Sequence, residues 1–205
     1  MRNRIYLLTP ILGFCSFVLL YIIAAALYPG GSDADPQSGG FSVLHNYWCE
    51  LLSPQAANGA ANPGWRVAMT AMILLCLSLA VFWWQVPILF GSCLAHKICI
   101  RGAGVISMAI TPFLSSRHHD LVITLASIPG IDALMTTFLA FYKDRRYRLV
   151  ILGAGCLGMI GVNNYVYYTG YGLYALPVLQ KATFLLVMIW MSWVTWLVYR
   201  HARKR

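Results

Sequence analysis

Long apolar runs separated by short polar breaks recur along the whole chain of 205 residues. A hydrocarbon core about 30 Å thick needs about 20 apolar residues per helix, and only helices or closed barrels satisfy their backbone groups inside it. Because 60% of the residues are hydrophobic and 10% are charged, little chain remains for a soluble domain. We predict an all-α, polytopic transmembrane helical bundle that forms a single integral membrane domain over residues 1–205. The six expected spans are residues 5–28, 65–90, 98–115, 121–142, 149–170 and 178–199.

The positions of Lys and Arg indicate the orientation, since short cytoplasmic loops keep an excess of these residues. Twelve of the 15 fall on one side of the expected spans, and the exceptions are Arg66, Arg117 and Lys181. Both termini are therefore expected in the cytoplasm, with the chain in a bacterial cytoplasmic (inner) membrane. Basic residues at span ends account for the net charge of +9 as anchors that contact anionic membrane lipids, so we expect no nucleic-acid partner.

The longest segment outside the spans, residues 29–64, carries a second helical pattern. Apolar residues recur at helical spacing between Phe41 and Ser53, and polar residues occupy the complementary face. This pattern predicts a short amphipathic helix in the extracytoplasmic interface. In such a helix Asn46 and Glu50 are neighbours on the polar face, as are His45 and Cys49.

Polar and ionisable residues collect at the expected outer ends of the spans. Such groups are costly at a bilayer boundary unless they pair with one another or meet a ligand. Our leading hypothesis is an outward-facing polar pocket that binds a lipid headgroup or a small polar ligand; mutual pairing is the simpler explanation. The candidate ligand-binding residues are Asn46, Arg66, Arg117, Asn163, Asn164, Gln180 and Lys181.

The histidines and carboxylates of the same region support an alternative, an intramembrane lipid hydrolase that could depend on zinc. Its metal ligands would be drawn from His45, Glu50, His118, His119 and Asp120. Without a metal, the catalytic residues would be His118 or His119 as the general base and Asp120 or Glu50 as its orienting group, with Cys49 as a candidate nucleophile. Because no HExxH or paired CxxC spacing is present, mutual pairing of these groups is favoured over a zinc site.

One carboxylate is expected inside a span, at Asp132. An isolated carboxylate in mid-span is rarely retained without a role, so Asp132 supports a second alternative, a transporter or channel. A structural role, as an acceptor for polar groups of neighbouring spans, is equally compatible with the sequence. No inverted repeat is evident to support transport.

A glycine motif in the fifth span has the letters of a dinucleotide fingerprint, with Gly153, Gly155 and Gly158 as its glycines. That fingerprint requires a strand before it and a helix after it in a soluble unit, which an apolar span does not offer. We interpret the motif as a stripe of small residues that allows close packing of helices.

Several short motifs resemble an uncharacterised family of bacterial six-helix integral membrane proteins. They are His45-Asn-Tyr-Trp-Cys-Glu-Leu-Leu52, Asn58-Gly59, Asn62-Pro63, His119-Asp120 and Leu176-Pro-Val-Leu-Gln-Lys181. The resemblance covers nearly the whole chain and implies the six-span topology and the location of the site, but no reaction. Members of that family often carry Ser-Asp where this chain has Cys49-Glu50, which argues against an obligatory Cys49 nucleophile. Homo-oligomerisation and a protein partner are left open.

Overall fold

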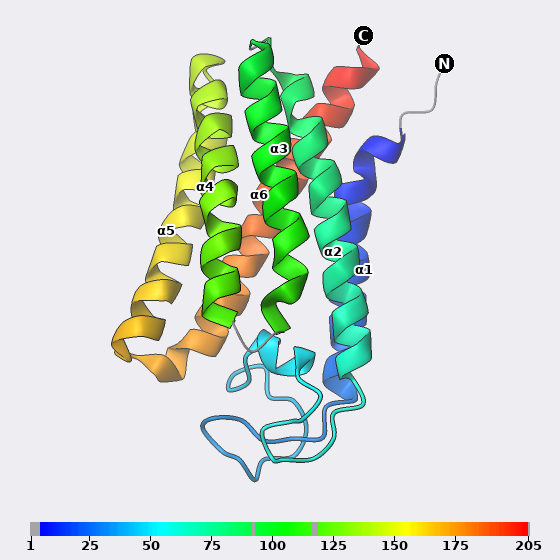
Figure 1. Ribbon diagram of the computed structural model, residues 1–205, viewed down its shortest axis with the longest axis vertical. Helices are drawn as coiled ribbons and strands as arrows, with labels where there is room; N and C mark the ends of the chain where they lie inside the picture. The colour runs from blue at the N-terminus through cyan, green and yellow to red at the C-terminus, as the bar shows by residue number, and fades with distance from the viewer. Residues whose placement is uncertain (1–4, 92, 116–118, 205) are drawn as a thin grey trace. The chain divides into compact units, whose positions relative to one another are not determined.

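A computed structural model describes residues 5–91, 93–115 and 119–204, with the side chains at positions 114, 115 and 119 left out of the description. Over this part of the chain no strand forms, and β-pairing is limited to isolated bridges between Gly30 and Gly39 and between Gln55 and Ala61. Figure 1 labels the six α-helices. They are α1 (Thr9–Ala26), α2 (Trp65–Gln85), α3 (Leu94–Ile110), α4 (His119–Lys143), α5 (Tyr147–Thr169) and α6 (Leu176–Arg203).

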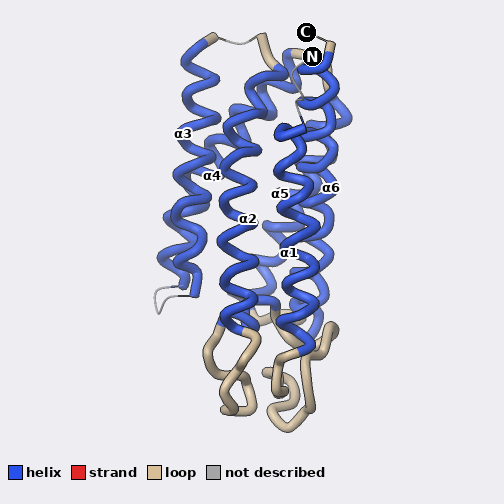
Figure 2. Tube along the Cα trace, turned by 90° about the vertical axis from the view of Figure 1, so that its right-hand side faces the viewer, coloured by secondary structure: helices blue, strands red, loops and turns tan. Residues whose placement is uncertain are grey.

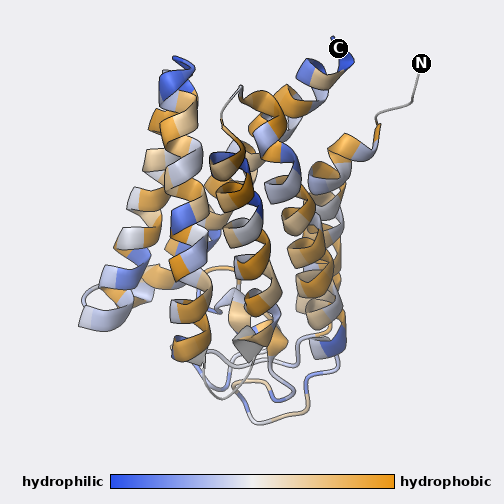
Figure 3. Ribbon diagram, turned by 45° about the horizontal axis from the view of Figure 1, so that its top comes forward, coloured by the Kyte–Doolittle hydropathy of each residue, from blue (hydrophilic) through white to orange (hydrophobic). Residues whose placement is uncertain are grey.

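Each helix, with the 3-10 turns that adjoin it, is long and apolar enough to cross a membrane. The six stretches are Ile5–Ala26, Trp65–Leu89, Leu94–Phe113, Asp120–Lys143, Tyr147–Thr169 and Leu173–Arg203. Hydrophobic residues dominate most of these helices (Figure 3). The prediction of an all-α bundle with six spans is confirmed, and the six apolar helices indicate an integral membrane protein.

The chain forms two compact units. The loop unit consists of Phe17–Met72 and Ala154–Val187, and the hairpin unit consists of Met1–Ser16, Ile73–Gly153 and Met188–Arg205. The loop unit takes its name from the connection between α1 and α2, which is mostly coil (Figure 2). The hairpin unit contains the whole of α3 and the described part of α4.

Small residues allow close helix packing in the hairpin unit. The Ser107 hydroxyl of α3 donates a 2.8 Å hydrogen bond to the Ala126 carbonyl of α4. A Cβ atom added at Gly104 of α3 would overlap the ring of Trp83 on α2. One glycine of the motif in α5 behaves as predicted, because a Cβ at Gly153 would overlap Phe138; at Gly155 and Gly158 it would meet open space.

The predicted amphipathic helix of residues 41–53 is wrong in its extent. The structure has only a 3-10 helix at Trp48–Leu52, preceded by a turn that begins at Ser42. Side chains capture the backbone groups that a helical ladder would use: Ser42 N–H donates to Asn46 Oδ1 at 2.7 Å, and Tyr47 N–H donates to Glu50 Oε1 at 2.8 Å. Short polar side chains compete with the helix in this way, so the periodic pattern does not become a continuous helix.

Candidate functional site

The 3-10 helix of the loop unit is anchored by Trp48. Its ring lies among three aromatic side chains, with centroids 5.7 Å from Phe17 and 5.4 Å from Tyr21 of α1 and 4.9 Å from Phe184 of α6. Ring pairs at such distances contribute beyond the burial of their area. Trp48 therefore holds the polar segment around it against two helices.

Asn46 is the centre of the polar cluster in this unit, and it is fully buried. Its Nδ2 group donates to the Gly31 carbonyl at 2.6 Å and to Glu50 Oε2 at 2.5 Å, while its Oδ1 atom accepts from Ser42 N–H. A buried amide is tolerated because its donors and acceptor are paired. Asn46 and Glu50, predicted neighbours on one face, are thus in direct contact.

Three donors converge on the Glu50 carboxylate. Besides the Asn46 amide, these are Tyr47 N–H at 2.8 Å and the Tyr28 hydroxyl at 3.3 Å. Desolvation by burial and the Glu50 charge raise the pKa of Tyr28, while the Ala57 N–H that it accepts acts in the opposite direction. Tyr28 was not singled out in the sequence, because nothing in its spacing connects it with Glu50.

Gln180 and Lys181, at the start of α6, bind the same segment from the other side. Trp48 N–H donates to Gln180 Oε1 at 3.1 Å. The Lys181 ammonium donates to the Asn46 carbonyl at 2.6 Å and to the Pro177 carbonyl at 3.0 Å, and it lies 5.8 Å from the centroid of the Phe41 ring. Three predicted ligand-binding residues, Asn46, Gln180 and Lys181, are thus brought together.

The remaining predicted ligand-binding residues lie apart from this cluster or outside the description. Asn163 of α5 donates to the Thr183 hydroxyl of α6 at 2.6 Å and leaves its Oδ1 atom buried without a described partner. Asn164 is exposed, and Arg66 is exposed beside the Trp65 ring, 5.6 Å from its centroid. Arg117 lies outside the described residues.

Asn62 is a second buried amide that the site analysis of the sequence overlooked. Its Nδ2 group donates to the Leu51 and Ser53 carbonyls at 3.2 and 2.9 Å, and its Oδ1 atom accepts from Gly64 N–H. It therefore ties the 3-10 helix to the start of α2. An Asn before Pro63 predicts a helix cap, but its cross-links depend on tertiary contacts.

The hydrolase alternative receives no geometric support from the described residues. Among them, no three His, Cys, Asp or Glu side chains converge to hold a metal. His45 instead contacts the Ser42 hydroxyl at 3.0 Å, and Asp120 lies in the first turn of α4. His118 lies outside the described residues, as does the side chain of His119, so the catalytic and zinc assignments stay predictions.

Cys49 is poorly suited to be a nucleophile. The residue reaches the surface of the loop unit, yet the protein atoms packed around its thiol and the nearby Glu50 charge raise its pKa to about 11. A thiol with this pKa is almost wholly protonated at neutral pH, and the thiolate is the reactive form. The raised pKa therefore argues against Cys49 as a nucleophile.

Asp132 lies within α4 of the hairpin unit and has an exposed side chain. The Cys99 thiol of α3 donates to its Oδ2 atom at 3.0 Å and lies 3.6 Å from the Thr136 hydroxyl. The sequence alone did not single out Cys99 as a partner of this carboxylate. The contact joins α3 to α4 and leaves the transporter alternative untested.

Comparison of the chain with protein-family models, with curated proteins and with solved structures found no match in any of the three.

Proposed function

We propose that this chain is a multi-pass membrane protein whose loop unit binds the phosphate-bearing headgroup of a membrane lipid. The observation that carries the proposal is the Lys181 ammonium, which is half-buried and held by two neutral carbonyl groups. No carboxylate oxygen of the described residues lies within 4.0 Å of it. An ammonium has three N–H donors, so a third donor is left for an anionic oxygen.

The surface around this unit has the composition of a membrane interface. Five tyrosines near the connection between α5 and α6 are at least half exposed: Tyr165, Tyr167, Tyr168, Tyr171 and Tyr174. Aromatic side chains of this kind sit at the level of lipid headgroups. Arg66, stacked near Trp65 at the start of α2, adds an exposed cation in the same unit. Headgroup phosphate is the anion most abundant at that level.

The rigid hydrogen-bonded segment supports recognition more than catalysis. The Asn46 amide binds Glu50, Glu50 accepts Tyr47 N–H, and Gln180 accepts Trp48 N–H, so the segment whose Asn46 carbonyl binds Lys181 is held in place. A cation fixed in advance loses little conformational freedom when a ligand binds. The arrangement therefore suits selective retention of a headgroup.

Substitution of Lys181 by Gln tests the proposal. Gln keeps an N–H donor for the carbonyls but removes the charge, so the purified variant should fold and retain one phospholipid fewer. Bound lipids would be counted by native mass spectrometry after addition of phosphatidylglycerol, of phosphatidylethanolamine and of diacylglycerol, which lacks phosphate. We expect the wild type, but not K181Q, to prefer both phospholipids over diacylglycerol.

Lys181→Arg is the matched control, because it keeps the charge and should retain the phospholipid. A folded K181Q that keeps the wild-type number and preference of bound lipids would overturn the proposal. If K181Q does not fold, Arg66→Gln provides the test, since Arg66 is exposed and its loss should weaken phospholipid retention without altering the fold. Unchanged retention in R66Q would then count against the proposal.

A further inference from the structure

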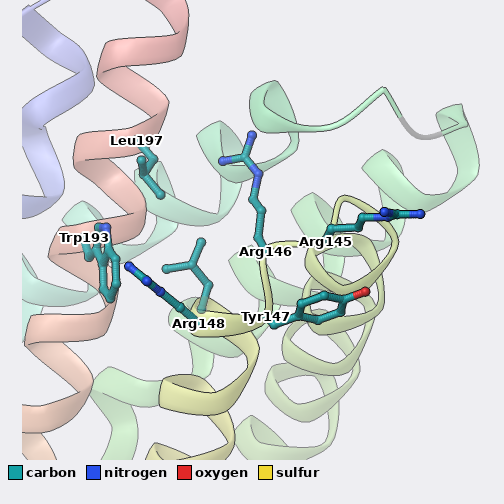
Figure 4. A pocket seen from close by; sticks show the side chains of 7 residues that line it. Arg145, Arg146, Tyr147, Arg148, Trp193 and Leu197 are labelled. Atoms are coloured by element: carbon teal, nitrogen blue, oxygen red, sulfur yellow. The ribbon is translucent and has the colours of Figure 1, made fainter.

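A separate pocket of about 410 Å³ lies in the hairpin unit, beside the turn that joins α4 to α5. Arginines from the turn and from the start of α5 line it, together with Trp193 and Leu197 of α6 (Figure 4). Neither the span pattern nor the polar cluster of the loop unit singles out this place. The positive charge and the apolar wall of the pocket together indicate a ligand that has an anionic group and an apolar part.

The turn has one defined conformation. Arg146 N–H donates to the Phe141 carbonyl at 2.9 Å and Arg145 N–H donates to the Tyr142 carbonyl at 3.0 Å, which is the Schellman pattern of a helix end. Arg145 occupies the left-handed position of this motif, with φ of 55°, where glycine is usual. The backbone conformation therefore fixes the position from which each arginine side chain extends.

The base of the pocket is fixed as well. The Trp190 indole N–H of α6 donates to the Leu149 carbonyl of α5 at 2.9 Å, and both side chains are buried. The Trp190 ring packs edge-on against Phe138 and Phe141 of α4. The three helices that surround the arginines are thus held together before any ligand arrives.

The arginines differ in direction. Figure 4 shows the Arg148 guanidinium extending toward Trp193 and the Arg146 side chain rising upward from the turn, whereas Arg145 extends away from Trp193. Within the described part of the chain Arg146 has one ion pair, to Asp144, at the long distance of 4.0 Å. Among the described residues no carboxylate lies within 4.0 Å of the Arg148 guanidinium. Two guanidinium groups at the pocket therefore have donors left for an anion.

We propose that this pocket binds the phosphate of an anionic phospholipid. Guanidinium groups match phosphate oxygens in charge and in the spacing of their donors. The pocket lies at the start of the α5 span, at headgroup level, and Trp193 and Leu197 offer an apolar wall for the glycerol and the first carbons of an acyl chain. Free phosphate shares the anionic chemistry but cannot use this wall.

The test uses the purified full chain in a neutral detergent, titrated with short-chain phosphatidylglycerol and, separately, with inorganic phosphate. Intrinsic tryptophan fluorescence would report binding, with Trp193→Phe identifying the signal of Trp193. We expect R146Q and R148Q each to weaken phosphatidylglycerol binding about tenfold, the effect of losing a charge-assisted hydrogen bond. R145Q removes the same charge from the same turn. Arg145 also borders the pocket, but its side chain extends away from Trp193, so binding should weaken by less than about threefold.

Two further variants sharpen the test. Asp144→Asn removes the carboxylate that competes for Arg146 and should strengthen binding. Arg148→Lys keeps the charge without the forked donors, so its affinity should lie between those of the wild type and R148Q. Lys181→Gln, in the loop unit, should leave this fluorescence signal unchanged, which separates this site from the proposed function.

Three results would overturn the proposal. Equal losses in R145Q, R146Q and R148Q would indicate diffuse attraction by the basic turn and no defined site. Inorganic phosphate that binds as tightly as phosphatidylglycerol would indicate an anion site without lipid selectivity. Wild-type affinity in folded R146Q and R148Q would exclude the arginines as ligands of phosphate. If R148Q does not fold, wild-type affinity in both R146Q and R148K would exclude them.

Discussion

Asn46 shows how a single polar side chain organises the loop unit. Its amide joins the Gly31 carbonyl, the Ser42 N–H and the Glu50 carboxylate, and no part of the side chain is exposed. We predict that Asn46→Ala lowers the free energy of unfolding by about 2–4 kcal/mol, because it leaves several buried partners unpaired. Thermal unfolding of the detergent-solubilised protein, followed by tryptophan fluorescence, would measure the loss.

Asn164→Ala is the matched control for this prediction. Asn164 is the same residue type in the same unit but is exposed, so its removal should change stability by no more than about 0.5 kcal/mol. Equal destabilisation by the two substitutions would contradict the central role of Asn46. A wild-type unfolding midpoint for N46A would contradict it too.

At this scale the sequence predicts part of the site. The spacing of Asn46 and Glu50 predicts their contact, since four residues bring side chains together in a helix and also across the turn observed here. It cannot predict that Lys181 binds the Asn46 carbonyl, because 135 residues separate them and only the packing of α6 brings them together. Nothing in the sequence indicates that the backbone N–H of Trp48 donates to Gln180 Oε1, because 132 residues separate the two.

At the scale of elements, the glycines of α5 have different roles despite their common motif. A Cβ at Gly153 would overlap the Phe138 ring, whereas a Cβ at Gly155 would meet open space. We predict that Gly153→Ala destabilises the chain by about 1–3 kcal/mol through overpacking. Gly155→Ala should be neutral or stabilise by up to about 1 kcal/mol, because Ala favours helix over Gly.

Unfolding midpoints of the two variants in one detergent would give the sign of each effect. If both substitutions stabilise, the close approach of Gly153 to Phe138 is contradicted. If both destabilise to the same extent, the whole motif acts as one packing stripe, as the sequence predicts. Different roles for the two glycines would agree with the division of the chain, because Gly153 belongs to the hairpin unit and Gly155 belongs to the loop unit.

Elements differ in how far their sequence determines them. Long apolar runs determine the spans, because an apolar helix of about 20 residues satisfies every backbone group by itself. The segment from Phe41 to Ser53 has a helical pattern as well, yet its polar side chains bind its backbone and only Trp48–Leu52 becomes helical, as a 3-10 turn. Short amphipathic segments depend on such local competition, which periodicity does not record.

At the scale of the whole molecule, the distribution of basic residues predicts the orientation in the membrane. An even number of spans places both termini on one side, and the excess of Lys and Arg assigns that side to the cytoplasm. Gln37, in the connection between α1 and α2, and Lys204, after α6, are exposed positions suited to a reporter thiol. Each can be replaced by Cys in a chain whose six native cysteines have been removed.

We predict that a membrane-impermeant maleimide labels Q37C in intact cells, while K204C is labelled only after the membrane is permeabilised. Labelling of both variants in denaturant would control for the presence and reactivity of the thiol. The reverse pattern would contradict the predicted orientation, and equal labelling of both in intact cells would contradict the six-span topology.

Orientation also decides which lipids each unit meets, because anionic lipid attracts basic segments most strongly at the cytoplasmic leaflet. Two helices, α5 and α6, separate the turn at Arg146 from Lys204, so the six-span topology places the pocket and Lys204 on one side. Cytoplasmic exposure of K204C would therefore agree with an anionic phospholipid in the pocket beside Arg146 and Arg148.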